Sequence, residues 1–577
     1  MDVSRGCNEK SDQAPKERKK LPRAASETPH SCRKQRGKDG PPADTVPLIN
    51  RSGDTIQHMD TISPDSFSWA LAHVRKFGDT DIFPHPFEYD SIAHDWNSLA
   101  KGIGTLNLHD HKVGTDRRCF VPKPGGGFRA AIQLDPIDHL IYTAAVYEIA
   151  ESIEKCRVPA HRKVACSYRL SLTSDGAFFA PDSGWPDFHA RSKTLALGKF
   201  SHVLVADIAD FYNQLSHHRI QNALELASVS HERSIGLEKF LGRLTAKQSR
   251  GLPVGPLPSI PLAEACLNDV DNFLLRQGTE FVRYVDDFRI FCSSRKEAIE
   301  GRHALTEYLF TAHRLSLESS KTKILFVEKF VSEELDDPEE QEQRAKMDRL
   351  KELIDENQPE DPGWYSLEPP EAPDEEVLAS QAEQESFAEL FRECVLQPPL
   401  QLGLAKYLLR KATQRRTVVL NDMVVNSLES LTPLMRDVVR YLSTTIPKNS
   451  ASTRGQQILR FARDEDSGGL PFVRMWILEL LSRRPDLLDA KAALKFAEES
   501  VRVLGLRGTA LLALAHKQAD WVRAYKETWR NHAPWDRRAI IWPAAMLPKG
   551  EKKSFLEMVS DDGDALDAAV AKHARSM

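Results

Sequence analysis

Two adjacent acids interrupt an apolar stretch of this chain. The segment "RYVDDFRIFC", residues 283–292, places Asp286 and Asp287 between two runs that are rich in apolar residues. Aspartate is common in turns, so a polar hairpin tip is the simplest interpretation. The alternative is chemical, because paired carboxylates bind divalent cations when a third acid joins them. The choice depends on a partner acid elsewhere in the chain.

The segment "VLVADIADFYNQL", residues 203–215, supplies that partner. Asp207 ends an apolar run 79 residues before Asp286. As a simple alternative, Asp207 caps a helix that follows it. Nucleotidyl transfer, however, needs two divalent metals about 4 Å apart, which clamp the attacking and the leaving oxygens. One carboxylate at a strand end and two on a neighbouring hairpin meet that need, since Mg²⁺ prefers oxygen ligands.

A third segment lies between these two. "GLPVGPLPSIPLAEACLNDVDNFL", residues 251–274, opens with glycines and prolines and continues as an apolar pattern from about Pro261. Glycine and proline fix a turn and let the backbone approach a ligand. We therefore expect a tight loop followed by a helix.

The order of these segments resembles motifs A to D of reverse transcriptases. The motifs read D-I-x-x-F-Y (207–212), G-L-P-x-G-x-x-x-S (251–259), Y-V-D-D (284–287) and "LSLESSKTKILF" (315–326). Upstream, "CFVPKPGGGFRAAIQLDPIDHLIYTAAV" (119–146) is similar to the fingers segment of these enzymes. The resemblance covers about 46–332. It implies an α/β right-hand polymerase with fingers and palm.

The resemblance also implies a role for individual residues. Asp207, Asp286 and Asp287, with the backbone carbonyl of Ile208, correspond to the ligands of two Mg²⁺ ions, for which Mn²⁺ is an alternative. Lys123 and Arg129 correspond to the cations that grip the incoming triphosphate; the alternative is that they are solvated surface charges.

Four further positions follow from the same motifs. Lys321 corresponds to the lysine that helps pyrophosphate leave, with Lys323 as a close competitor, and Gly255 and Ser259 lie in the motif B loop. Tyr212 corresponds to the steric gate beneath the sugar. RNA-templated RNA polymerases place an Asp at that offset, whereas a tyrosine ring fills the space of a 2′-OH. The expected substrates are therefore dNTPs, and the expected product is single-stranded DNA.

Other segments resemble the abortive-infection and unknown-group reverse transcriptases of bacteria. They are "PVGPLPSIPLAE", "ACSYRL" (165–170) and "WPDF" (185–188). Separately, Val254 is a departure, because many reverse transcriptases have Gln there; the loss of its hydrogen bond near primer and template favours weaker template dependence, and the alternative is that Val254 simply packs. The likeness to the bacterial enzymes implies anti-phage defence and DNA synthesis without a template, primed by a tyrosine of the protein. The candidate primers are Tyr407, Tyr441 and Tyr525. The alternatives are a conventional reverse transcriptase that copies a dedicated non-coding RNA, and a non-catalytic scaffold.

The elements that position these residues are short strands and long helices. "HVLVAD" (202–207) and "EFVRYV" (280–285) are rich in Val and read as strands, and residues 138–154 have helical spacing. From about 381 to 577 helices dominate, as in "FVRMWILELLSRRPD" (472–486) and the similar pattern at 509–529. We expect an all-α domain of HEAT-like stacked hairpins, in which tryptophans form core rather than base-stacking platforms.

The charge of the chain is unevenly distributed. Its 577 residues carry a net −5, but residues 333–376 hold 18 acidic and 4 basic residues, which leaves +9 on the remainder. Residues 333–380 are expected to form an acidic linker or insertion. Residues 1–45, with 11 Lys and Arg before position 40, are expected to be a disordered basic tail that is solvated or touches nucleic acid.

Composition also indicates the setting. No apolar run approaches the roughly 20 residues of a membrane span, and the N-terminal segment lacks the apolar core of a secretory signal. The eight cysteines are scattered singly, which favours a reduced, cytoplasmic environment. The apolar helix faces in the C-terminal part lead us to expect a homo-oligomer.

Overall fold

The computed structural model describes residues 61–79, 82–103, 106–123, 126–181, 184–335, 381–396 and 400–577. All of them belong to one compact unit, residues 59–577. The expected basic tail and most of the expected acidic linker, residues 336–380, lie outside the described residues, and the proposed domain boundaries stay predictions.

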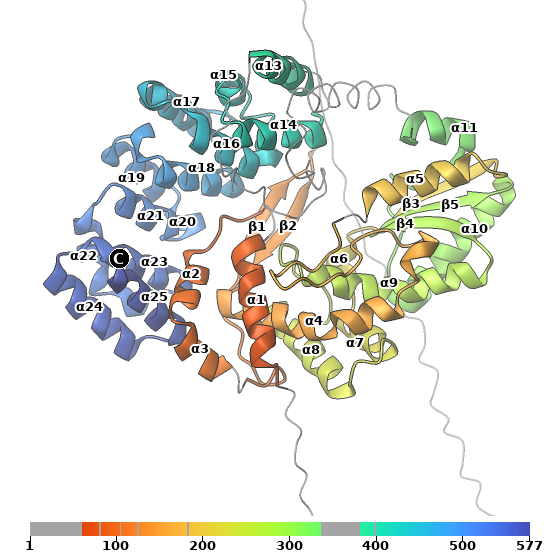
Figure 1. Cartoon of the computed structure of the whole chain (residues 1–577), viewed down its shortest axis with the longest axis horizontal. Coiled ribbons are helices and arrows are strands. Elements are labelled where there is room, and N and C mark those ends of the chain that lie inside the picture. The colour runs from red at the N-terminus through yellow and green to blue at the C-terminus, as the bar shows by residue number, and fades with distance from the viewer. Residues whose placement is uncertain are drawn as a thin grey trace, which may run out of the picture. The chain divides into compact units, whose positions relative to one another are not determined.

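A four-stranded antiparallel sheet carries the sequence motifs (Figure 1). Its strands are β3 (His202–Asp207), β4 (Glu280–Tyr284), β5 (Asp287–Cys292) and β6 (Lys323–Phe326), in the order β4-β5-β3-β6. The predicted strand at 202–207 is confirmed, and the one predicted at 280–285 ends one residue earlier.

Alternating side chains of this sheet enter two different cores, as the two-residue period of a strand requires. Leu204 and Ile290 face the main core, which includes helices α9 (Ser259–Arg276) and α10 (Arg295–Tyr308). Val203 and Phe291 face a smaller core that contains Phe188 of α5 (Trp185–Ala196). Helices on both faces therefore hold the sheet.

A separate hairpin precedes the sheet in the chain. Strands β1 (Arg117–Pro122) and β2 (Phe128–Gln133) pair antiparallel, and α4 (Pro136–Cys156) follows with Asp135 as its N-cap. The helix predicted at 138–154 is thus confirmed. Helix α1 (Pro64–Phe77) packs along α4. Helices α2 (Phe87–His94) and α3 (Trp96–Ile103) also precede the sheet, whereas α6 (Phe211–Gln214), α7 (His217–Leu226) and α8 (His231–Leu244) lie between β3 and β4 in the chain.

The described residues from 381 onward are helical. The main elements are α13 (Gln381–Leu396), α14 (Leu402–Gln414), α16 (Met435–Thr445), α17 (Ala451–Asp464), α18 (Pro471–Arg483), α19 (Ala490–Glu498), α21 (Arg507–Ala515), α22 (Ala519–Lys526), α23 (Pro534–Ile541), α24 (Lys549–Asp562) and α25 (Ala565–Ser576). Whether they form HEAT-like repeats stays a prediction. The pattern at 509–529 divides into α21 and α22, because Lys517 between them adopts a left-handed conformation with φ of 54°.

Hydrophobic cores join the C-terminal helices to the earlier part of the chain. Trp529 and Ile540 belong to the same core as Tyr89 and Leu140. A second core joins helices α14 to α19 to Cys119 of the β1–β2 hairpin. The indole nitrogens take part as well: Trp476 donates to the Ile82 carbonyl at 3.1 Å and Trp535 donates to the Thr115 carbonyl at 2.8 Å. These tryptophans are core residues, as predicted.

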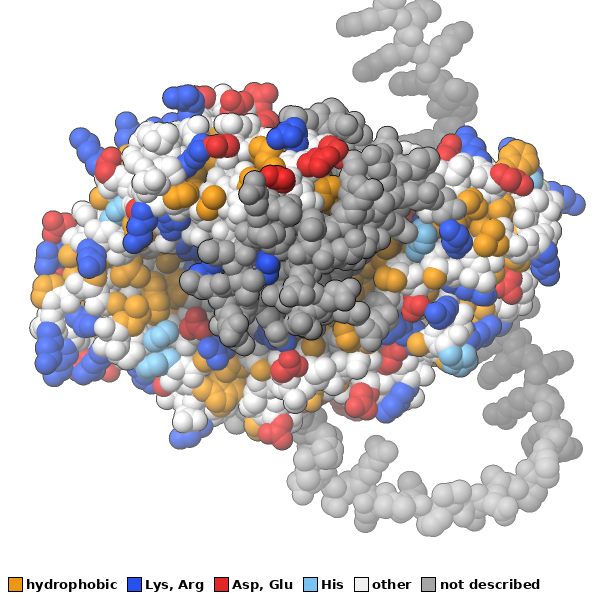
Figure 2. Space-filling view, turned by 45° about the horizontal axis from the view of Figure 1, so that its top comes forward, with side chains coloured by type: hydrophobic (Ala, Val, Ile, Leu, Met, Phe, Trp, Pro, Cys, Tyr) orange, Lys and Arg blue, Asp and Glu red, His pale blue; other side chains and the backbone are white. Residues whose placement is uncertain are grey.

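Charge is distributed without an obvious single-sign region on the face shown in Figure 2. Basic and acidic side chains are interspersed there with hydrophobic ones. Among the described helices, none combines the length and the apolar character that crossing a bilayer requires.

Candidate active site

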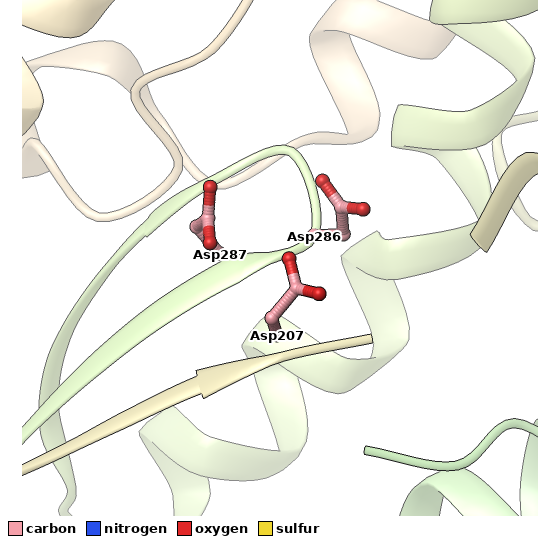
Figure 3. A group of neighbouring side chains, drawn as sticks. All are labelled: Asp207, Asp286 and Asp287. Carbon is pink, nitrogen blue, oxygen red and sulfur yellow. The ribbon is translucent and has the colours of Figure 1, made fainter. Parts of the chain in front are cut away.

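Strand pairing brings the three predicted acids together. Asp207, the last residue of β3, lies opposite Asp287, the first residue of β5. Asp286 lies in the turn between β4 and β5, and one carboxylate oxygen from each residue lies within 4.8 Å of the others. Figure 3 shows the three carboxylates gathered at this end of the strands. The interpretation of the paired acids as an ordinary hairpin tip is therefore insufficient.

Backbone hydrogen bonds lock this end of the sheet. The Ile208 amide donates to the Asp286 carbonyl at 3.2 Å, which ties the end of β3 to the turn. The Glu318 amide donates to the Asp207 carbonyl at 2.7 Å, which ties in the segment before β6. Three sequence motifs that are distant along the chain thus share one hydrogen-bonded framework.

The electrostatics of the group suit a divalent cation. Burial, followed by the charge of Asp207, raises the pKa of Asp286 to about 6. Burial and the neighbouring charges of Asp286 and Asp207 raise the pKa of Asp287 to about 7. Three carboxylates this close repel one another, and a bound cation relieves that repulsion. The all-oxygen donor set fits Mg²⁺ or Mn²⁺.

The two candidate lysines differ in their contacts. The Lys321 ammonium donates to Asp207 Oδ2 at 3.0 Å and is 63% exposed, so it can leave this carboxylate. Lys323 instead lies on β6, where its Nζ is 3.9 Å from Glu334. Only Lys321 of this pair contacts the carboxylates.

Tyr212, five residues after Asp207, has a half-buried side chain. Its ring meets the Phe211 ring edge-on, with centroids 5.4 Å apart. Burial, with contributions from Tyr168 and Asp286, raises the pKa of the Tyr212 phenol well above its usual range, so the group stays neutral. The Leu252 amide donates to the Tyr212 carbonyl at 2.8 Å, which fixes the tyrosine against the glycine-rich loop.

The glycine-rich loop packs tightly against the β1–β2 hairpin. Gly255 has a φ of +134°, and a Cβ added there would lie 2.9 Å from the Ile132 carbonyl oxygen. The Val254 carbonyl accepts from the Ile132 amide at 2.8 Å, and its side chain packs against the second core. Ser259, buried at the start of α9, donates to the Pro253 carbonyl at 2.6 Å. These residues shape the loop from within.

The two predicted triphosphate-binding cations lie on the β1–β2 hairpin. Arg129 is exposed, and its positive charge opposes the rise in the pKa of Asp286 and of Tyr212. Lys123 is exposed just after β1, where its amide donates to the Gly127 carbonyl at 2.7 Å. Arg129 pairs with Val121, two residues before Lys123, so the two cations lie on the two sides of one hairpin.

The residues packed beneath the β4–β5 turn were not predicted from the sequence. Arg283 is fully buried and is bonded to Glu264 and Asp271 of α9, and Ser167 contacts the turn itself. The sequence contained one signal for this buried cluster, which is an arginine within the apolar strand at 280–284. Its partners lie 12 and 19 residues earlier, on a helix that sequence alone does not orient.

Comparison with known proteins identifies the domain. Residues 121–354 match the family model for reverse transcriptase (RNA-dependent DNA polymerase). No curated protein matches the chain.

Among solved structures, telomerase from Candida albicans in complex with the TWJ fragment of telomeric RNA is 10% identical, with a TM-score of 0.29 and coverage of 71% of this chain and 69% of that chain. Apo telomerase from Candida tropicalis is 11% identical, with a TM-score of 0.30 and coverage of 78% and 72%. Likenesses this distant carry no argument about the chain.

The family match includes every segment that builds the site: the β1–β2 hairpin from residue 121, the end of β3, the glycine-rich loop, the β4–β5 turn and Lys321. Convergence of these segments on three carboxylates agrees with that match. The chain therefore carries a reverse transcriptase domain, and the protein is a nucleotidyltransferase, a DNA polymerase of the reverse transcriptase type.

Proposed function

We propose that the protein adds dNTPs to a growing DNA strand by two-metal nucleotidyl transfer at Asp207, Asp286 and Asp287. The observation that carries this proposal is the convergence of the three carboxylates within 4.8 Å at the end of one strand pair. These residues, with the Ile208 carbonyl, would hold two Mg²⁺ ions, which supply charge neutralisation and activation of the attacking 3′-oxygen when bound. Mn²⁺ is the alternative ion.

The neighbouring side chains have distinct roles in this proposal. Arg129 and Lys123 grip the triphosphate from the hairpin, since guanidinium and ammonium groups bind phosphate. Tyr212 closes the space beneath the sugar against a 2′-OH. Lys321 stands beside Asp207 and supplies positive charge or a proton as pyrophosphate leaves. Gly255 permits the close approach of the loop to the hairpin.

Substitution of one carboxylate tests the site. Asp286→Asn keeps the volume of the side chain and removes the charge that holds the metal, so labelled dNTP incorporation with Mg²⁺ should fall by several orders of magnitude. Asp187→Asn is the matched control, because Asp187 is a carboxylate of the same domain that pairs with the exposed Lys163. Near-normal synthesis by Asp286→Asn would show that the site is assigned wrongly.

The template and the primer form the second part of the proposal. Synthesis is RNA-directed or independent of a template, and it starts on a tyrosine hydroxyl of the protein. A phenolic oxygen is a competent nucleophile when it is activated. Val254 gives this idea less support than the sequence suggested, because its side chain packs against the second core. The resemblance to abortive-infection enzymes remains its basis.

The three candidate primers differ in their surroundings. The Tyr441 hydroxyl donates to the Thr417 carbonyl at 2.9 Å and accepts from the Leu420 amide at 3.1 Å, within the core. Tyr407 is also buried, with 5% exposure. Tyr525 is half-buried, with its ring 4.8 Å from that of Trp521. Of these three, Tyr525 is the one that we propose as the primer.

A denaturing protein gel tests the primer. After incubation with a radioactive dNTP, label should migrate with the protein, resist RNase and collapse with DNase. Tyr525→Phe should abolish the covalent product, whereas Tyr441→Phe should retain it. If all label runs as free DNA, or vanishes when co-purifying RNA is digested beforehand, the conventional enzyme that copies a non-coding RNA is the correct description.

The biological setting rests on the resemblance alone. We propose a cytoplasmic homo-oligomer that acts in defence against phage. Phage plating on cells that express the wild type or Asp286→Asn tests the role, and equal plating on both would refute it. Size-exclusion chromatography with light scattering tests the assembly, for which a monomeric mass would be contrary evidence.

A further inference from the structure

A fully buried arginine lies directly behind the catalytic turn. Arg283 of β4 has 0% exposure, and its guanidinium makes five hydrogen bonds. Two go to Asp271 at 2.7 and 2.8 Å, two go to Glu264 at 3.0 and 3.2 Å, and one goes to the Val285 carbonyl at 2.8 Å. A guanidinium has five N–H donors, so this one is saturated.

Val285, the residue before the two aspartates, has an unusual backbone. Its φ is 52°, in the left-handed region that β-branched residues strongly disfavour. Such a conformation persists only where the surroundings impose it. Both backbone polar groups of Val285 are held: the carbonyl accepts from Arg283, and the amide donates to Ser167 Oγ at 2.9 Å. The turn is thus clamped from two sides.

Ser167 is in turn fixed by a buried carboxylate. Its hydroxyl donates to Glu264 Oε1 at 2.7 Å, so the same oxygen accepts from Val285 and donates to Glu264. Glu264 also accepts from Arg157 at 2.7 Å. Burial alone would raise the pKa of Glu264, but Arg283 and Arg157 lower it below its usual value. The positive charges of Arg157 and Arg283 thus balance the negative charges of Glu264 and Asp271 inside the protein.

We propose that Ser167, Glu264 and Arg283 are positioning residues, which form a cradle that holds Val285 left-handed and so aims Asp286 and Asp287 at the metals. The cradle has a second consequence, because Glu264 and Asp271 belong to α9, the helix that begins in the glycine-rich loop. Buried ionic contacts therefore tie α9, which begins in that loop, to the strand that leads into the carboxylate turn. This inference rests on the proposed metal site.

Removal of the Ser167 hydroxyl tests the cradle with little change in volume. Ser167→Ala leaves the buried Val285 amide without its acceptor, so it should lower kcat for dNTP addition about tenfold to a hundredfold and should raise the Mg²⁺ concentration needed for half-maximal rate. Ser192→Ala is the matched control: Ser192 is equally buried and accepts from the buried Arg289, on the other face of the sheet. Its kcat and Mg²⁺ requirement should stay near wild type, whatever its effect on stability.

Val285→Gly provides the decisive comparison, because glycine adopts a positive φ without strain. In this background Ser167→Ala should cost less than it costs in the wild type. An equal loss in both backgrounds, or an unchanged kcat and Mg²⁺ requirement in Ser167→Ala, would overturn the inference. Asp286→Asn separates the two proposals: if it is inactive while Ser167→Ala behaves as wild type, only the cradle fails, and if it is active the metal site fails.

Discussion

Replacement of Arg538 by Gln should destabilise the whole unit, although Arg538 lies far along the chain from the catalytic motifs. Its side chain, on α23, is 1% exposed and donates to Asp135 Oδ2 at 2.9 Å and to Glu88 Oε1 at 3.4 Å. The guanidinium also lies 5.0 Å from the centroid of the Trp535 ring. Asp135 caps α4, directly after the β1–β2 hairpin. Arg538 therefore joins the C-terminal helices to the polymerase domain.

The size of the effect follows from what the substitution leaves behind. Breaking a buried ion pair by removing one partner costs about 3–5 kcal/mol. Glu88 keeps Arg507, which donates to it at 2.8 and 3.0 Å, so only Asp135 loses its partner. We therefore expect a loss near the lower limit, about 3 kcal/mol of unfolding free energy.

The pH dependence has a definite sign. Burial raises the pKa of Asp135 from 3.8 to about 6, although Arg538 opposes the rise. Because the folded chain binds this proton more tightly than the unfolded chain, the group favours folding below about 3.8 and becomes less favourable as pH rises to about 6. Without the guanidinium the pKa rises further. The deficit of Arg538→Gln should thus be smaller at pH 5 than at pH 8.

Urea denaturation at pH 5 and at pH 8, followed by tryptophan fluorescence, measures the stability that Arg538→Gln loses. Arg523→Gln is the control, since Arg523 pairs with Glu551 on the surface and is 42% exposed; its midpoint should barely change at either pH. Two results would refute the reasoning. One is an Arg538→Gln variant that unfolds at the same urea concentration as the control variant, and the other is a loss of unfolding free energy that is larger at pH 5 than at pH 8.

The other predictions concern the site and its support. Tyr212→Ala should raise incorporation of ribonucleotides relative to deoxynucleotides, whereas Tyr212→Phe, which keeps the ring, should not; an unchanged ratio in the alanine variant would contradict the gate. Lys321→Ala should slow single-turnover dNTP addition about tenfold to a hundredfold, and Lys323→Ala should have little effect; equal rates in the two variants would contradict the assignment. Removal of residues 381–577 should abolish activity and solubility, because it uncovers core residues such as Tyr89 and Leu140; an active soluble fragment would contradict this.

The sequence was sufficient to predict that Asp207, Asp286 and Asp287 come together, because their placement depends on local pattern. Asp207 and Asp287 lie at the ends of short Val- and Phe-rich runs, and antiparallel pairing of two such runs places their ends together. The strand at 202–207, the helix near 138–154 and the loop before α9 follow from the same local signals. The order of these elements carried the resemblance to reverse transcriptases, and the family match agrees with it.

Tertiary structure decided what depends on contacts between distant segments. Lys321 and Lys323 are two residues apart in sequence, and only the pairing of β6 with β3 places the first against Asp207. From the sequence, the side chains of Val254 and Tyr441 could have faced a ligand, but Tyr441 lies within the second core and Val254 packs against it. The cradle around Val285 joins residues more than 100 positions apart. Side-chain environment at such separations is set by how helices pack, which periodicity does not encode.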